Sequence, residues 1–338
     1  MPVMVNRFHP IELTLYDIIF HEKPCISAID YYGNYLFTCG DDCAVRVWNI
    51  KVSNRNKYYE VNCRRTEKNT SLGIELVREF VGFDKMVTAI KIREFGDDLL
   101  VAIGTENGTV TLLKIREKDV KGKVERRELN KGMGNACYDL CIGMNKVICG
   151  FMSGEIRIID IDQNKENNKN TEIAEYQVHS GAIQGMSYCE TTKMLAIQGS
   201  DHCVKVYLIN ETGIDLIHTV RDGLDKTAAI NKRLLIDEEY LYVFKRGFTF
   251  TAYDVRDEFK PSWKMGPFNN ALKKIVRDGE FTAIFTNASI YILHGEEKVC
   301  YVDKAAFCEI TDGFMTNGCV FYSSKDGFMR AIRLSLTD

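Results

Sequence analysis

Short apolar runs alternate with compact polar turns along most of the sequence. Each unit of the pattern is an apolar run, a turn containing Gly, Asp or Asn, and a second run in which apolar and polar positions alternate. Alternation with a period of two predicts a half-buried β-strand, and the Gly or Asp between the runs predicts a hairpin turn. The pattern recurs in segments that begin at Tyr35, Leu99, Val147, Met194, Leu241, Ala283 and Cys319.

These copies have the spacing of a propeller repeat. After the first copy, the central turns lie roughly 40 to 48 residues apart, which is the period of a four-stranded blade. Additional apolar runs precede the hairpins, as at Met86 and Ala136, and others follow them, as at Ile74 and Ile173. The sequence therefore predicts an all-β fold, a seven-bladed propeller that occupies residues 1–338 as a single domain.

Two segments complete this prediction. Residues 13–20 are expected to form the closing strand of the last blade, because an open array would leave an unpaired sheet edge. Residues 51–73 are polar and rich in Asn, Lys and Arg, so they are predicted to be a surface insertion within the first blade. Residues 271–278 are compatible with two helical turns, but their place in the repeat favours a strand.

Composition narrows the classes of function. The chain is 45% hydrophobic and 27% charged, with a formal net charge of -3. A freestanding duplex-DNA binder is normally strongly basic, so no direct contact with DNA is expected. There is no run of about 18 apolar residues that could cross a membrane, and the first residues lack the apolar stretch of a signal peptide. We expect a cytosolic or nuclear protein with no membrane partner.

The cysteines and the short motifs argue against catalysis. Twelve cysteines include no C-x-x-C pair, and Cys39, Cys149, Cys189 and Cys319 sit in apolar runs. Such residues are expected to be small buried hydrophobic side chains in a reducing compartment rather than disulfides or metal ligands. Phosphate-loop, zinc-protease and serine-hydrolase motifs are absent. The sequence thus predicts no catalytic residue, metal, cofactor or small-molecule substrate.

Several positions resemble the WD40 family. In that family a hairpin-turn Asp precedes a Trp on the third strand, and a His before the first strand completes a buried hydrogen-bonded network. Asp42 lies six residues before Trp48, and Asp201 and Asp326 lie six residues before Tyr207 and Ile332. The resemblance implies a structural network formed by His21, Asp42, Trp48, His179, Asp201, Tyr207 and Asp326. Blades two, three, five and six lack the full pattern and are expected to depend on apolar packing.

A narrower resemblance rests on the first and fourth copies. The segment from Leu13 to Ile50 is similar to the start of the WD40 subunit of chromatin assembly factor I and of the related HIR histone-chaperone proteins. Its D-x-x-V-R-x-W hairpin is carried by Asp42, Val45, Arg46 and Trp48, and Pro24 fits the preceding loop. The fourth copy resembles the same group through His179, Gln184, Gly185, Asp201, Lys205, Val206 and Tyr207.

This resemblance implies a non-catalytic, nuclear scaffold subunit of a chromatin assembly complex, a histone chaperone that helps deposit histones H3 and H4 on DNA during replication or repair. The implied partners are the large subunit of the assembly factor and, directly or through other subunits, the two histones. Many relatives dock the anti-silencing histone chaperone through a polar C-terminal tail. This sequence stops at Asp338 without one, so that partner stays open. The alternative is another WD40 adaptor, nuclear or cytoplasmic, in RNA processing, ubiquitin ligation or trafficking.

Partner contacts in WD40 proteins most often involve the loops before the first strand and between the second and third strands of each blade. By this analogy, the candidate partner-binding residues are Lys23, Asp41, Asp84, Lys85, Ser200 and Lys325.

Overall fold

The structure is a computed structural model of the chain. It describes residues 16–19, 25–51, 73–132, 134–161, 173–211, 213–221, 224, 234–295, 297–302, 305, 308–316 and 319–333. The chain divides into two compact units, one made of Gly82–Leu272 and the other of Met1–Val81 together with Lys273–Asp338.

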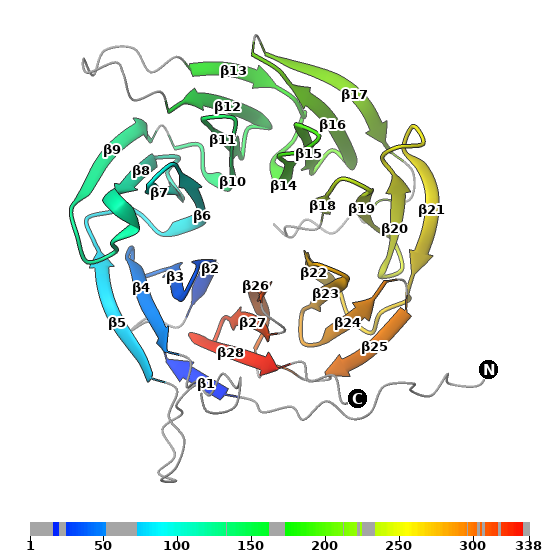
Figure 1. The fold of residues 1–338 in the computed structure, drawn as a ribbon. Coiled ribbons are helices and arrows are strands. Elements are labelled where there is room, and N and C mark those ends of the chain that lie inside the picture. Colours follow the sequence, from blue (N-terminus) through cyan, green and yellow to red (C-terminus); the bar gives the residue numbers. More distant parts are fainter. Residues whose placement is uncertain are drawn as a thin grey trace. The chain divides into compact units, whose positions relative to one another are not determined.

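The unit Gly82–Leu272 contains four antiparallel sheets, each made of four consecutive strands (Figure 1). Their strands are β6 (Val87–Phe95), β7 (Asp98–Thr105), β8 (Val110–Ile115) and β9 (Val124–Asn130); β10 (Cys137–Gly143), β11 (Lys146–Phe151), β12 (Glu155–Asp160) and β13 (Ile173–Gln177); β14 (Ile183–Cys189), β15 (Met194–Gly199), β16 (Cys203–Ile209) and β17 (Ile214–Val220); and β18 (Leu234–Ile236), β19 (Tyr240–Lys245), β20 (Thr249–Asp254) and β21 (Lys260–Met265).

The other unit contains three four-stranded sheets. Their strands are β2 (Ile26–Tyr32), β3 (Tyr35–Gly40), β4 (Val45–Lys51) and β5 (Gly73–Phe80); β22 (Leu272–Asp278), β23 (Phe281–Thr286), β24 (Ile290–His294) and β25 (Glu297–Val302); and β26 (Ile310–Thr316), β27 (Cys319–Ser324), β28 (Phe328–Arg333) and β1 (Tyr16–Ile19). We number the blades 1 to 7 by their first strands, β2, β6, β10, β14, β18, β22 and β26.

The last sheet is completed from the beginning of the chain. β1 pairs antiparallel with β28, in a register that places Tyr16 opposite Ala331 and Ile19 opposite Phe328. The predicted closing strand is therefore confirmed for residues 16–19, while 13–15 and 20 lie outside the described residues. This pairing supplies the fourth strand that blade 7 would otherwise lack.

The strand assignments agree with the sequence pattern. The segment with an alternative helical interpretation is the strand β22, and the only helical turn among the described residues is a 3₁₀ turn, Arg116–Lys118. The predicted insertion begins at Lys51, the end of β4, and ends at Gly73, the start of β5, while 52–72 lie outside the described residues. That residues 1–338 form a single domain stays a prediction.

The second and third strands of the blades carry most of the apolar core. In β7 the run Leu99–Ile103 is buried throughout, and β8 is buried at every position. Burying one Leu or Ile side chain contributes about 1.5–3 kcal/mol, so these central strands are the main source of stability. Cys39, Cys149, Cys189 and Cys319 are buried free thiols, which confirms their predicted role as small apolar side chains.

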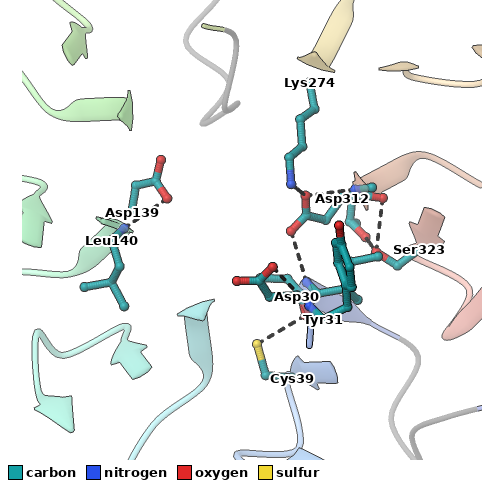
Figure 2. A network of polar contacts seen from close by, with 12 residues as sticks. Asp30, Tyr31, Cys39, Asp139, Leu140, Lys274, Asp312 and Ser323 are labelled. Carbon is teal, nitrogen blue, oxygen red and sulfur yellow. Dashed lines mark hydrogen bonds and ion pairs between the residues drawn. The ribbon is translucent and has the colours of Figure 1, made fainter. Parts of the chain in front are cut away.

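The first strands of neighbouring blades are joined by buried carboxylates. Five first strands contain a register shift after their first residue, for example between Ile310 and Asp312 in β26. Asp312 is buried, and its carboxylate accepts hydrogen bonds from the Ile29 backbone N–H of β2 at 3.0 Å and from Gly313 N–H at 2.8 Å. Figure 2 shows that Lys274 of β22 reaches the same carboxylate. Asp312 thus connects the first strands of blades 6, 7 and 1.

Asp139 occupies the same position in blade 3. Its carboxylate accepts hydrogen bonds from the backbone N–H of Met186 in β14 at 2.8 Å and of Leu140 at 3.0 Å. A carboxylate that satisfies two backbone donors in a buried place is a strong link, because each donor would otherwise lose its hydrogen bond to water. Asp139 joins blades 3 and 4 in the way that Asp312 joins blades 7 and 1.

Candidate partner-binding face

The turn between the second and third strands has one backbone conformation in five blades. The N–H of the fourth residue donates to the carbonyl of the first, as Cys43 does to Gly40 and His202 does to Gly199. The fourth residue is left-handed in each case, with φ of 58°, 90°, 84°, 62° and 81° at Cys43, Gly108, Gly154, His202 and Gly327. The third residue carries a polar side chain in each turn: Asp42, Asn107, Ser153, Asp201 and Asp326.

In blades 1 and 7 the turn Asp pairs with an Arg on the third strand. Arg46 Nη1 lies 2.5 Å from Asp42 Oδ2, and Arg330 Nη2 lies 2.8 Å from Asp326 Oδ2. The Arg330 side chain is only 1% exposed, so this is a buried ion pair. Ser324, the first residue of the turn, hydrogen bonds to both members of the pair.

Trp48 belongs to the same region of blade 1 through a different partner. Its indole Nε1–H donates to the Thr38 hydroxyl of β3 at 3.0 Å. Asp42 and Trp48 are therefore both held by polar contacts in blade 1, Asp42 by Arg46 and Trp48 by Thr38. The predicted His21 lies outside the described residues.

Blade 4 uses a histidine instead of an arginine. His179 Nδ1 lies 2.8 Å from Asp201 Oδ1, and the His179 side chain is fully buried. Asp201 also accepts hydrogen bonds from the Ser180 and Cys203 backbone N–H groups. The strand cation of this blade, Lys205, does not reach the Asp but donates to the Val178 carbonyl. The structure thus brings together His179 and Asp201, with Tyr207 buried on the same blade.

Glycines make room for this arrangement. A Cβ on Gly199 would lie 2.4 Å from His179 Nδ1 and 2.8 Å from Asp201 Oδ1. A Cβ on Gly154 would lie 2.2 Å from the His179 carbonyl, and the Gly154 carbonyl accepts the N–H of His179. Only glycine at these two positions permits the close approach of the loop that carries the imidazole.

The protonation states follow from burial and from the partners. Burial lowers the pKa of His179 below its ordinary 6.5, although Asp201 acts in the opposite direction. Burial alone would raise the pKa of Asp201, but His179 and the two backbone N–H groups bring it below 3.8. Burial, and then Asp201, raises the pKa of Tyr207. At neutral pH the network is a neutral imidazole bonded to a carboxylate, which fits a structural role.

The structure corrects one expectation for blades 2 and 3, which do not depend on apolar packing alone. In blade 2, Asn107 Oδ1 accepts from Thr105 Oγ1 at 2.6 Å and from Thr109 N–H at 3.1 Å. In blade 3, Asn135 and Ser153 hydrogen bond to each other twice, at 2.8 and 2.9 Å. Asn and Ser replace the Asp of the family pattern because they also accept backbone N–H groups in turns.

Three predicted partner-binding residues occupy the same position in the turns of their blades. Asp41, Ser200 and Lys325 are the second residues of the turns in blades 1, 4 and 7. Lys325 is exposed, and its Nζ lies 2.5 Å from Glu309 Oε2. The other oxygen of Glu309 pairs with Lys273 of β22, so one carboxylate bridges two ammonium groups.

These charges shift the local pKa values. Burial would raise the pKa of Glu309, but its hydrogen bonds to Lys273 and Lys325 lower it overall. The bond to Glu309 raises the pKa of Lys325. Burial, followed by the nearby Asp41, raises the pKa of the Cys25 thiol to about 11. Cys25 is therefore protonated at neutral pH and is not an activated nucleophile.

The predicted residues of blade 2 also lie in a loop before a first strand. Asp84 accepts a hydrogen bond from the Asn107 amide, and Lys85 is exposed. Lys23 lies outside the described residues.

Sequence reasoning missed an aromatic and apolar pair in blade 3. Met152, in the turn after β11, is 55% exposed, and the Tyr138 hydroxyl lies 3.6 Å from its sulfur. Burial, and then Glu106, raises the pKa of Tyr138. An exposed Met beside a half-buried Tyr is typical of contact surfaces, and a turn Met in place of a polar residue was the available signal.

Neither a metal site nor a membrane span is found in the part of the chain that the structure describes. No group of three His, Cys, Asp or Glu side chains there is placed to hold a metal ion. No described helix has the length and apolar character needed to cross a bilayer.

Comparisons with known proteins support the architecture. Residues 14–49 match the family model "WD domain, G-beta repeat". No curated protein matches the sequence. Among 1514 matching chains of solved structures is the "Crystal structure of WD40 beta propeller domain of Doa1", with a TM-score of 0.69 and 12% sequence identity, covering 96% of this chain and 98% of that one.

At this identity the likeness shows the fold alone. It confirms the predicted fold class, an all-β, seven-bladed WD40 β-propeller closed by the N-terminal strand. Propellers of this kind are typical of protein-interaction scaffolds and are generally non-catalytic.

Proposed function

We propose that this WD40 propeller is a non-catalytic scaffold subunit of a chromatin assembly complex, a histone chaperone that helps deposit histones H3 and H4 on DNA during replication or repair. The observation that carries the proposal is the sequence of blade 4. There His179, Gln184-Gly185, Asp201 and the Lys205–Tyr207 strand resemble the pattern of the chromatin assembly factor I and HIR subunits. Two members of that pattern, His179 and Asp201, are in direct contact.

In the proposed mechanism the protein binds its partners through turns that are already ordered. The turns of blades 1, 4 and 7 are fixed by Asp–Arg or Asp–His contacts, so their second residues are presented on a rigid backbone. A surface that is already ordered loses little conformational entropy when a partner binds. The turn residues Asp41, Ser200 and Lys325, together with Asp84 and Lys85, are the contacts we propose for the large subunit.

The net charge of the chain is compatible with indirect contact to DNA. The chain as a whole carries a formal net charge of -3. A protein of this charge would not accumulate the phosphate contacts that sustain duplex binding. Histones H3 and H4, or a basic region of the large subunit, would provide that contact. We therefore propose a nuclear protein that reaches chromatin through its partners; the anti-silencing histone chaperone remains an open partner.

A second candidate is a WD40 adaptor of another complex, in RNA processing, ubiquitin ligation or trafficking. It is favoured by the likeness to the Doa1 propeller domain, which covers nearly the whole chain at low identity. A fold shared at 12% identity is compatible with many unrelated partners.

The test is affinity purification of the tagged full chain from nuclear extract, with the recovered proteins identified by mass spectrometry. The proposal predicts recovery of a large assembly-factor subunit together with histones H3 and H4. A matched variant, Lys325→Glu with Asp84→Lys, reverses two contacts and keeps the net charge, and it should recover less of the large subunit. Recovery of a stable complex that contains neither the large subunit nor histones would contradict the proposal and favour the adaptor.

A further inference from the structure

The outer half of blade 5 carries an open groove that the proposed function does not use. It follows β20, β21 and the turn after β19, and its volume is about 590 Å³. This is within the size range of ligand sites, roughly 300–1,000 Å³. An open groove along two strands is suited to an extended chain rather than to an enclosed small molecule.

Every charged residue that lines the groove is a cation. Lys245, Arg246 and Lys264 line it, and no carboxylate does so among the described residues. Two other hollows of this unit have mixed signs, with Lys146 and Asp160 in one and Arg116 and Glu125 in the other. Because the chain has a net charge of -3, the single sign in this groove is a local feature and does not reflect a basic protein.

Among the described residues, two carboxylates that follow the lining strand β20 are engaged elsewhere. Asp254, at the end of β20, accepts the backbone N–H groups of Arg256 and Asp257. Asp257 pairs with Lys260 at 2.6 Å. Neither carboxylate lines the groove, so neither can neutralise Arg246 and Lys264 there. The guanidinium of Arg246 is positioned by a hydrogen bond from Nε to the Leu224 carbonyl at 3.0 Å.

Trp263 supplies a second and independent observation. It lines the groove, and its ring packs against Phe250 at 5.2 Å and Tyr242 at 6.0 Å. Its Nε1–H is buried and has no acceptor among the described residues. A Trp ring in the wall of an open groove offers a bound segment a large apolar contact area, and Trp is enriched at protein interfaces.

We propose that this groove of blade 5 binds an acidic, extended segment of a partner protein. Carboxylates of the segment would pair with Arg246 and Lys264, and the segment would lie against the Trp263 ring. A nucleic acid is the poorer match, because three cations cannot replace the six to ten phosphate contacts typical of such binding. The inference does not depend on the chromatin role, since it rests only on the residues of blade 5.

The test uses the full chain and a fluorescein-labelled peptide of eight glutamates, measured by fluorescence anisotropy at 50 mM salt. Arg246→Glu with Lys264→Glu should weaken binding by about tenfold or more, since both charged contacts become repulsive. The control variant, Lys121→Glu with Lys131→Glu, makes the same charge change at exposed sites of blade 2 and should change binding less than about twofold. Circular dichroism establishes that each variant is folded.

A second measurement tests whether the peptide binds beside the Trp263 ring. In a Trp48→Phe background, Trp263 is the sole tryptophan, and its emission should shift as the peptide is added. The proposal is overturned if the peptide does not bind at up to 1 mM, if both double variants lose binding equally, or if Trp263 emission does not respond. Tighter binding of a single-stranded octanucleotide than of the peptide would also overturn it.

Discussion

The turns of blades 4 and 7 have the same backbone but satisfy their Asp in different ways. In blade 7 the Asp pairs with Arg330 of its own strand, and Ser324 fills the first position of the turn. In blade 4 the first position is Gly199, and the space without a side chain admits the His179 ring from the preceding loop. The partner of the turn Asp is thus a neutral imidazole from the preceding loop in blade 4 and a guanidinium from the third strand in blade 7.

The difference has an electrostatic consequence. Arg330 is charged at every accessible pH, whereas His179 is neutral at pH 7 because burial lowers its pKa. The turn of blade 7 is an ion pair and the turn of blade 4 is a titratable hydrogen bond. Four experiments test this comparison.

Removing the buried cation of blade 7 should have the largest effect. Arg330→Met leaves Asp326 without its pair in a nearly dry site, and we expect the free energy of unfolding to fall by about 3 kcal/mol. Arg46→Met in blade 1 should reduce the free energy of unfolding less, because Arg46 is more exposed and its second partner, Glu79, lies at the surface. Urea unfolding followed by circular dichroism measures both. A larger loss for Arg46→Met would contradict the ranking by burial.

Exchanging the first turn residues should affect the two blades unequally. Gly199→Ser places a Cβ against the His179 ring and should destabilise the protein by about 2 kcal/mol through steric strain. Ser324→Gly removes the hydroxymethyl side chain and its hydrogen bonds without creating a clash, and its cost should be about 1 kcal/mol. Thermal melts of the two variants give the comparison. Equal costs would show that Gly199 is not needed to admit the imidazole.

Lowering the pH should destabilise the protein through the His179–Asp201 contact of blade 4. The pKa of His179 in the folded protein lies below its ordinary 6.5, so below about pH 6.5 the unfolded chain binds more protons than the folded one, and stability falls as pH falls. His179→Asn keeps a donor to Asp201 but does not titrate, and it should reduce the loss of stability between pH 7.5 and 5.5.

Two controls make this pH test specific. The pKa of His218 is also lowered by burial, so His218→Gln removes a different titration and should leave the His179 contribution in place. Ser324→Gly, which leaves the ion pair of Asp326 with Arg330 in place, should keep the pH dependence of the original protein. If His179→Asn showed the original slope, the titratable link would not be His179.

The smallest change in the free energy of unfolding is expected for the exposed Lys325. Lys325→Met removes an exposed ammonium from Glu309, which still pairs with Lys273, so stability should change by less than about 1 kcal/mol. Binding of the large subunit should nevertheless fall, because Lys325 is a proposed contact. Melting temperature and pull-down on the same preparation separate the two effects; a large drop in melting temperature would assign Lys325 a structural role.

The repeat pattern was sufficient to predict the blades. Strand periodicity and turn residues identified all seven hairpins, and the leftover apolar run near Tyr16 indicated the closing strand. Even the lysine-rich segment β22, which allows a helical interpretation, followed from its place in the repeat. Periodicity succeeds here because each strand must alternate its side chains between two neighbouring layers.

The links between blades could not be predicted in this way. Asp312 contacts Ile29 across 283 positions of sequence, and nothing local distinguishes it from a solvated Asp. The ion pair of Asp326 with Arg330 was easier to predict from the sequence, because Asp42 and Arg46 form a pair with the same spacing. The groove of blade 5 could not be predicted from the sequence, because its cations come from two strands and a turn that meet only in the folded sheet.

The pairing of β1 with β28 also has a consequence for biosynthesis. Tyr16 leaves the ribosome long before Ala331, the residue opposite it in the sheet. During that interval β1 has no native partner, and a chain released before β28 would keep both β1 and the edge of β27 unpaired. Only a chain that includes β28 can therefore pair its first strand and limit the exposure of that strand to proteases and chaperones.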